Sequence, residues 1–194
     1  MKIIFATNNN HKALELQSVV PATIEIITLK HAGIDIDIPE PYDTLEENAV
    51  EKAKTIYSLT GLACFSEDTG LEVKALNGAP GVKSARYAGE EKSFDNNIDK
   101  LLSELKDKKD RSAQFRTVVC LIIDGQQYLF EGICKGRIIE ERRGEGGFGY
   151  DPVFVPEGAD KTFAQMSLQE KNMYSHRRLA ADKLVVFLNN LNIN

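Results

Sequence analysis

Residues 115–134 read FRTVVCLIIDGQQYLFEGIC, two runs of apolar and β-branched residues separated by Asp124-Gly125. Asp-Gly is typical of a tight hairpin turn, so the pattern predicts two antiparallel strands flanking this dipeptide. Near the N-terminus, the apolar run Lys2–Ala6 predicts a buried strand, and the polar segment Thr7–His11 leads from it into a helical pattern. A hairpin together with a strand, loop and helix predicts a mixed α/β fold.

Capping signals and periodicity place further elements. Thr44 and Glu47 have the spacing of a capping box and predict a helix that extends to about Leu59. The run Leu62–Phe65 predicts a strand that stops at Ser66, where polar residues begin. We also expect a Gly/Pro turn over Asn77–Gly81 and a solvated loop over Lys106–Arg111. Further helix starts are expected from a capping box at Ser167 and Glu170 and from a helix cap at Ser175. Three apolar helix faces are expected: Leu14, Leu16 and Val19; Ile98, Leu101, Leu102 and Leu105; and Leu184, Phe187, Leu188 and Leu191.

Bulk composition limits the class of protein. The chain has 194 residues, 42% hydrophobic and 27% charged, which favours one globular domain over residues 1–194. Its N-terminus lacks an apolar run long enough for a signal peptide or a membrane span, so we expect a cytoplasmic protein with no membrane partner. Cys64, Cys120 and Cys134 are widely spaced in apolar runs and indicate reduced, buried thiols. The net charge of −5 argues against a nucleic-acid partner but is compatible with a small anionic ligand.

The first polar cluster joins the N-terminal strand to its helix. It consists of Thr7, Asn8, Asn9, Asn10, His11 and Lys12. Free N–H groups at a helix start attract phosphate, and Lys12 adds a positive charge. An ordinary Asn-rich turn with a helix cap is the alternative.

Acidic residues form a second cluster. Asp68 follows the predicted buried strand together with Glu67 and Thr69, and Glu40 lies in a Pro-rich loop. Carboxylates that converge from separate loops suit Mg²⁺, which prefers oxygen ligands and commonly bridges to substrate phosphates. A solvated acidic turn is the alternative.

Lys52 falls near the apolar side of its predicted helix, close to Leu45 and Ile56. A buried ammonium needs an anion, because leaving it unpaired costs several kcal/mol. Phosphate is one such anion. The alternative is that the lysine stem lies along the surface and its charge reaches water.

Two C-terminal segments complete the set. Four glycines surround Phe148 in the loop Gly144–Tyr150, and either Phe148 or Tyr150 could stack on a planar base. Lys171 and the segment Ser175–Arg177 lie at a predicted helix start, where His and Arg offer donors to a carbonyl oxygen. A flexible hairpin loop and a solvated helix cap are the alternatives.

Taken in order, six segments of the chain resemble the inosine triphosphate pyrophosphatase family, also called the Ham1 or non-standard purine NTP pyrophosphatase family. The segments are FATNNNHKALEL (5–16), EENAVEKA (46–53), SEDTGLEV (66–73), GAPGVKSARYAG (78–89), GGFGYDPVF (146–154) and EKNMYSHRRLA (170–180). The resemblance implies an elongated mixed β-sheet with flanking helices, two lobes around a central cleft, and a homodimer. Asn8 departs from it, since most members have Gly there; Asn tolerates a left-handed backbone, so the loop could keep its shape.

The same resemblance implies a role for each matching residue. Thr7 to Lys12 and Lys52 would bind the triphosphate, and Thr69 would contact the substrate. Glu40 and Asp68 would bind Mg²⁺ with help from Glu67, and Asp68 would also accept the proton. The base-binding set would be Phe148, Gly149, Tyr150, Asp151, Lys171, His176 and Arg177.

These roles combine into one mechanistic hypothesis. A water activated at Asp68 attacks the α-phosphorus of an inosine, deoxyinosine or xanthosine triphosphate, which releases pyrophosphate and the nucleoside monophosphate. Two alternatives stay open: a pyrophosphatase with a different base preference, and a purine-nucleotide sensor without catalysis.

Overall fold

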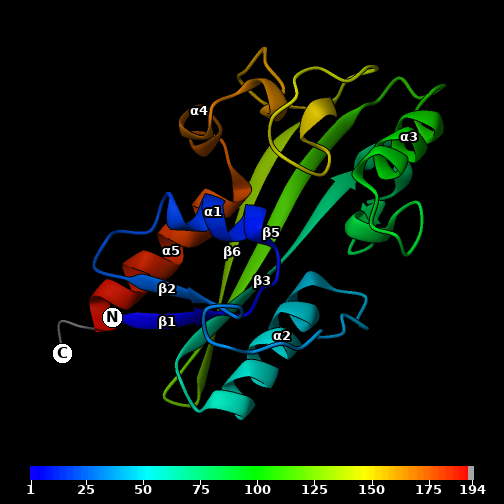
Figure 1. Cartoon of the computed structure of the whole chain (residues 1–194). Helices are drawn as coiled ribbons and strands as arrows, with labels where there is room; N and C mark the ends of the chain where they lie inside the picture. Colours follow the sequence, from blue (N-terminus) through cyan, green and yellow to red (C-terminus); the bar gives the residue numbers. More distant parts are fainter. Residues whose placement is uncertain (192–194) are drawn as a thin grey trace. The chain divides into compact units, whose positions relative to one another are not determined.

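The structure is a computed structural model that describes residues 1–191 (Figure 1). Within these residues, strands form one sheet in the order β2-β1-β3-β5-β6-β7, with β4 paired to β3. The strands are β1 (Lys2–Phe5), β2 (Glu25–Thr28), β3 (Cys64–Val73), β4 (Pro80–Gly81), β5 (Ser112–Ile123), β6 (Gln126–Ile138) and β7 (Phe154–Pro156). The α-helices are α1 (Asn10–Gln17), α2 (Leu45–Thr60), α3 (Phe94–Glu104), α4 (Leu168–Asn172) and α5 (His176–Leu191). Short 3₁₀ helices span Lys74–Leu76, Ser84–Arg86, Asp151–Val153 and Phe163–Gln165.

Pairing directions confirm the mixed α/β prediction. β1 runs parallel to both β2 and β3, whereas β4 pairs antiparallel with β3 and β7 antiparallel with β6. The predicted hairpin is formed by β5 and β6, whose turn places Asp124 and Gly125 at φ 50° and 72°. Positive φ at both central residues is the geometry that the Asp-Gly dipeptide favours.

The chain forms two compact units, which we describe separately. Unit 1 comprises residues 1–68, 117–132 and the chain from residue 177 onward. Unit 2 comprises residues 69–116 and 133–176. The expectation of a single domain stays a prediction.

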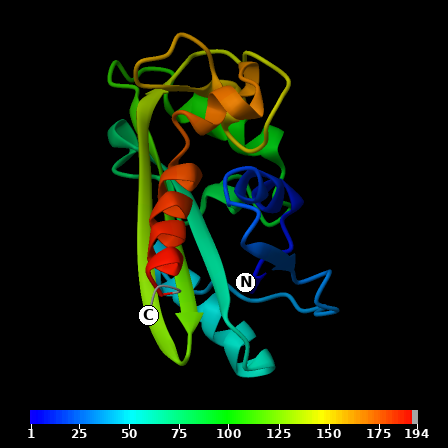
Figure 2. The ribbon, with the colours of Figure 1, turned by 90° about the vertical axis from the view of Figure 1, so that its left-hand side faces the viewer.

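The core of unit 1 is built from β1, α1, β3, β5 and α5. The rings of Phe5 and Phe65, which are register partners, stack at a centroid distance of 4.5 Å. α5 lies along the strands of this unit (Figure 2), and its Leu184 and Leu188 are buried as predicted. Leu191 was expected on the same face but is exposed. Leu14 is exposed as well.

The core of unit 2 contains the predicted face of α3, with Ile98, Leu101 and Leu105 all buried. Leu102 packs against this core from a half-buried position. Aromatic rings extend it, since Phe115 and Phe154 meet edge to face at 4.7 Å. This core supports the glycine-rich loop before β7.

β3 is longer than predicted, and this changes where the acidic residues lie. The sequence predicted a strand end at Ser66, but β3 continues to Val73, so Glu67 and Asp68 lie inside a buried strand. Polar residues followed by Gly70 are typical of a loop, which is why the strand was predicted to end early. In the structure, a Cβ at Gly70 would come within 2.6 Å of the Gly81 carbonyl oxygen, so glycine allows β4 to approach β3 closely.

The charged run Lys106–Arg111 is exposed as expected except at its last residue. The guanidinium of Arg111 donates to the carbonyl oxygens of Leu105, Ile138 and Ile139 at 2.7–3.0 Å. Arg111 therefore joins the end of α3 to the end of β6, and the prediction of a purely solvated loop was wrong there.

Helix caps agree with the sequence. The Thr44 side chain accepts from the Glu47 N–H and caps α2, and Ser167 forms a reciprocal capping box with Glu170 at α4. Among the described residues, no helix combines the length and apolar character that crossing a membrane requires.

Candidate functional site

The loop after β1 is organised by its own side chains. Asn9 caps α1, since its side-chain oxygen accepts from the N–H groups of His11 (3.0 Å) and Lys12 (3.2 Å). The Thr7 hydroxyl accepts from the Asn9 N–H at 3.1 Å. The helix N-terminus and Lys12 together give this loop a positive end, which suits an anion.

Asn8 connects the same loop to the segment between β2 and α2. Its side-chain amide donates to the Ile36 carbonyl oxygen at 2.9 Å. Asn8 is not one of the described residues with positive φ, so this position does not need the conformational freedom of glycine. The neighbouring Asn10 is the first residue of α1 and is exposed.

Alternation along β3 places its two acidic residues on opposite faces of the strand. Phe65 faces α5 and packs in the core that this helix helps to form. Glu67, two residues later, points to the same side and accepts a hydrogen bond from Arg177 of α5. Ser66 faces α2 by donating to the Ala49 carbonyl oxygen, and Asp68 follows it to contact Lys52 of α2. Each face therefore carries a separate charged network.

On the α5 side, Arg177 is buried between two carboxylates. It donates to both oxygens of Glu67, at 2.8 Å and 2.9 Å, and also to Glu15 of α1. Lys12 lies 3.1 Å from Glu67 as well, which ties the loop after β1 to this network. The geometry favours a structural counter-ion role for Glu67 and Arg177 over the metal and base contacts that the resemblance implied.

These contacts set the ionisation of Glu67. Burial alone would raise the pKa of Glu67, but the charges and hydrogen bonds of Arg177 and Lys12 lower it to about 2. Sequence reasoning missed Glu15, the other partner of Arg177. Its position three residues after Lys12 puts both side chains on one side of α1, a signal that was available.

On the α2 side, Lys52 lies between Glu40 and Asp68. Its ammonium is 2.5 Å from Glu40 Oε1 and 3.0 Å from Asp68 Oδ1, and its side chain is only 8% exposed. The inward orientation read from the helical pattern is confirmed, whereas the surface alternative for the Lys52 stem was wrong. In this structure the anions that Lys52 requires are carboxylates.

The three charges alter one another's ionisation. Burial lowers the pKa of Lys52, but Asp68 and Glu40 more than offset this, so the ammonium stays protonated. Burial raises the pKa of Asp68, and Glu40 adds to the increase, while Lys52 and Lys12 lower it only in part. A carboxylate with a raised pKa is a better proton acceptor than an ordinary aspartate.

The Glu40 and Asp68 carboxylates fit a hard divalent cation, because they already converge on one cationic nitrogen. They are only two groups, and residues 1–191 contain no cluster of three or more His, Cys, Asp or Glu side chains suited to a metal ion. Water and phosphate oxygens would have to supply the remaining ligands, as is common for Mg²⁺.

In unit 2, the glycine-rich loop is held by Asp151. The Asp151 carboxylate accepts from the Phe148 N–H at 2.9 Å and from the Lys171 ammonium at 2.6 Å. The Lys171 and Asp151 side chains are 5% and 4% exposed. The same ammonium lies 5.2 Å from the Phe148 ring centroid, so loop, acid and lysine form one assembly.

The aromatic residues of this loop differ in role. Phe148 is half-buried, whereas Tyr150 is buried in the core and its hydroxyl donates to the Ser84 carbonyl oxygen at 2.8 Å. Phe148 or Tyr150 was expected to stack on a base, and the burial of Tyr150 favours Phe148. Phe148 remains the candidate, with Gly149 beside it at φ 61°.

The other predicted residues of unit 2 are placed as follows. His176 is buried at the start of α5, and its ring stacks on Phe115 at 4.7 Å. Thr69 is half-buried in β3. Ser175, expected to cap α5, is buried directly before it. The structure brings Phe148, Asp151 and Lys171 together. The His176 ring packs against Phe163, a residue of the unit 2 core.

Gly147 provides a test of the loop. A Cβ there would overlap the Asp151 carboxylate, and the residue has φ +73°. We expect Gly147→Ala to destabilise the protein by about 2 kcal/mol, because backbone strain and the overlap add. Gly158→Ala is the matched control, since Gly158 has φ +83° but open space around its Cβ position, and it should lose only about 1 kcal/mol. Equal losses in denaturant unfolding would show that Asp151 does not constrain the loop.

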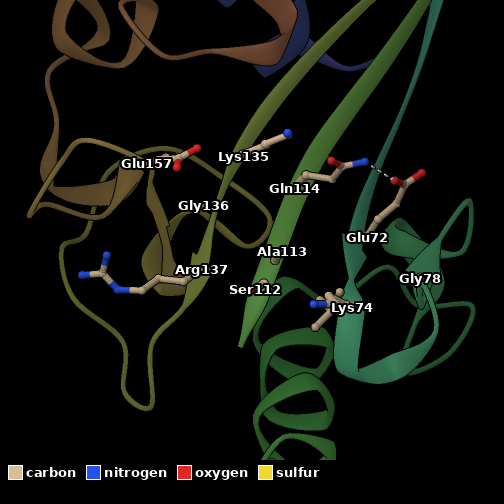
Figure 3. A pocket seen from close by; sticks show the side chains of 11 residues that line it. Glu72, Lys74, Gly78, Ser112, Ala113, Gln114, Lys135, Gly136, Arg137 and Glu157 are labelled. Carbon is tan, nitrogen blue, oxygen red and sulfur yellow. Dashed lines mark hydrogen bonds between the residues drawn. The ribbon is translucent and has the colours of Figure 1, made fainter. Parts of the chain in front are cut away.

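A separate cavity of about 560 Å³ lies in unit 2, along β3, β5 and β6 (Figure 3). Lys74, Lys135 and Arg137 line it together with Glu72 and Glu157, and Gln114 donates to Glu72 at 2.7 Å. None of the candidate site residues lines this cavity. Its mixed charges give no preference for a particular ligand.

Comparisons with known proteins agree over nearly the whole chain. A model of the Ham1 family matches residues 3–187. A protein named dITP/XTP pyrophosphatase from Flavobacterium psychrophilum is 52% identical over 190 residues, which cover 98% of this chain and 100% of that protein. One of the same name from Porphyromonas gingivalis is 51% identical, covering 96% and 97%. The solved structure of a HAM1 protein from Coxiella burnetii has a TM-score of 0.89 and 37% identity, covering 98% of this chain and 99% of that one.

Proposed function

Because this chain belongs to the Ham1 family, we propose that it hydrolyses inosine, deoxyinosine and xanthosine triphosphates to the nucleoside monophosphate and pyrophosphate. The observation that carries the proposal is the α2 side of unit 1, where the buried Lys52 and Asp68 form one charged cluster with the more exposed Glu40. Such a cluster serves no purpose as a packing device, since apolar residues of the same size would be at least as stable there.

The triphosphate is bound by unit 1 in this proposal. The start of α1, shaped by Asn9 and Thr7, turns the positive end of the helix dipole toward the phosphates in this proposal. Lys12 and Lys52 add two positive charges. Positive groups of this kind offset the charge that develops on the leaving pyrophosphate.

Asp68 acts as the proton acceptor. A water placed against its carboxylate loses a proton to Asp68 as it attacks the α-phosphorus, and the bond to the β-phosphate oxygen breaks. The raised pKa of Asp68 supports this role. When held by Glu40 and Asp68, Mg²⁺ supplies charge neutralisation for the phosphate chain.

The purine is recognised by residues of unit 2. In this proposal Phe148 stacks on the ring, and Lys171 and His176 are donors that the resemblance assigns to the 6-oxo group of hypoxanthine or xanthine. Gly149 and Asp151 fix the loop around the base. A 6-amino group brings a donor instead of an acceptor and leaves these buried groups unpaired, which discriminates against adenine.

We also propose a homodimer, which the resemblance supports, and a cytoplasmic location. Sedimentation velocity tests the first, and cell fractionation tests the second.

A substrate panel tests the proposed function. The value of kcat/KM should be at least about 10²-fold higher for dITP, ITP and XTP than for ATP and dUTP, and chelation of Mg²⁺ should abolish turnover. Highest turnover of dUTP or ATP would favour the pyrophosphatase of different base preference. Tight binding of ITP without turnover in Mg²⁺ would favour the sensor.

A further inference from the structure

Lys52 occupies the position that a cation bound by Glu40 and Asp68 would take. Its ammonium reaches Glu40 Oε1 and Asp68 Oδ1 at once, and these two side chains are 28% and 10% exposed. The lysine arises from the middle of α2, where Ala49 and Ala53 on either side are fully buried. The pairing is therefore fixed by the helix and is not a chance surface contact.

The same two carboxylate oxygens cannot readily contact the lysine and a divalent ion at the same time. A divalent ion held by Glu40 and Asp68 would compete for the carboxylate oxygens that the Lys52 ammonium now contacts. Like charges held by the same oxygens repel by several kcal/mol at the dielectric of a partly buried site. This repulsion disfavours binding of both cations to the same pair of oxygens.

We infer that Lys52 is an internal counter-ion, which holds Glu40 and Asp68 in the metal-free protein and leaves them when a divalent metal ion binds. The inference rests on the proposed function, because that function assigns the metal to these carboxylates. The displaced ammonium then needs a new anion, since a buried unpaired ammonium is costly.

Coupled binding follows from this exchange. A polyphosphate provides the anion that the released Lys52 requires, so metal and triphosphate should each bind more tightly in the presence of the other. Without a triphosphate, the lysine competes with the metal and keeps its affinity low. The protein would thus resist filling its site with metal until substrate is present.

Calorimetric titration of the nucleotide-free protein with Mg²⁺ tests the inference. Lys52→Met, which keeps the length of the stem and removes the charge, should bind Mg²⁺ at least about tenfold more tightly than the wild type. Lys52→Arg, which keeps the competing charge, should remain close to the wild type. The control is Lys54→Met, because Lys54 is an exposed lysine of the same helix.

Equal Mg²⁺ affinity of wild type and Lys52→Met would overturn the counter-ion role and leave the proposed function intact. Absence of Mg²⁺ binding by both would overturn the metal site itself. A second measurement uses only the wild type, in case Lys52→Met does not fold. Saturating Mg²⁺ should increase the rate of amine labelling at Lys52 several-fold, measured by mass spectrometry, and leave Lys54 unchanged. An unchanged rate at Lys52 in the metal-bound protein would also overturn the inference.

Discussion

Asp68→Asn is expected to lower kcat for dITP hydrolysis by about 10²–10⁴-fold, the range that removal of a positioned general base produces. Asparagine keeps the size of the side chain but cannot accept the proton from the attacking water. It also removes one of the two carboxylates that would hold the metal, so the loss should fall toward the upper end. The measurement is steady-state pyrophosphate release at saturating Mg²⁺ and nucleotide.

The control for this prediction is Asp107→Asn, since Asp107 is exposed in the loop after α3. Circular dichroism should show that both variants are folded, because Lys52 keeps its contact with Glu40 when Asp68 is replaced. Turnover within about threefold of the wild type in folded Asp68→Asn would remove Asp68 from its role.

Arg177→Met is expected to lower the free energy of unfolding by about 3–5 kcal/mol, the cost of leaving buried carboxylates without their cation. Arg177 is 2% exposed and binds Glu67 and Glu15, so methionine would remove the cation that these two buried acids share and leave Glu67 with Lys12. Adding Glu15→Gln to Arg177→Met should recover part of the loss, because one of the unpaired charges is then gone. Urea unfolding gives the values.

The next residue along the helix provides the matched control. Arg178 pairs with Asp182 on the surface, where both side chains are more than 40% exposed, so Arg178→Met should cost less than about 1 kcal/mol. The resemblance instead implied that Arg177 recognises the base. A stable Arg177→Met protein with reduced preference for dITP over dATP would favour that role and contradict the structural one.

Local chemistry made much of the fold predictable. Thr44 and Ser167 fix the starts of their helices through side-chain hydrogen bonds to nearby N–H groups, and Asp124-Gly125 fixes a turn through its own φ angles. Such signals lie within a few residues of the structure they specify. The strand β3 was different, because Glu67 and Asp68 are tolerated inside it only through cations supplied by distant segments.

The sequence predicted which residues form the candidate site, but it did not predict all of the partners that hold them. Lys52 showed its inward orientation through the helical period alone, and the structure supplies its two partners. The burial of Tyr150 depends on an acceptor 66 residues away in the sequence, and no local pattern contained it. Glu15 was missed although its spacing from Lys12 was a local signal, because a lone acidic residue on an amphipathic helix normally faces water.

The position of water attack tests the central claim most directly. Hydrolysis of dITP in H₂¹⁸O, followed by mass spectrometry of the products, should place one ¹⁸O atom in deoxyinosine monophosphate and none in pyrophosphate. That result is required if a water activated at Asp68 attacks the α-phosphorus. Label in pyrophosphate, or release of orthophosphate as the first product, would contradict the account.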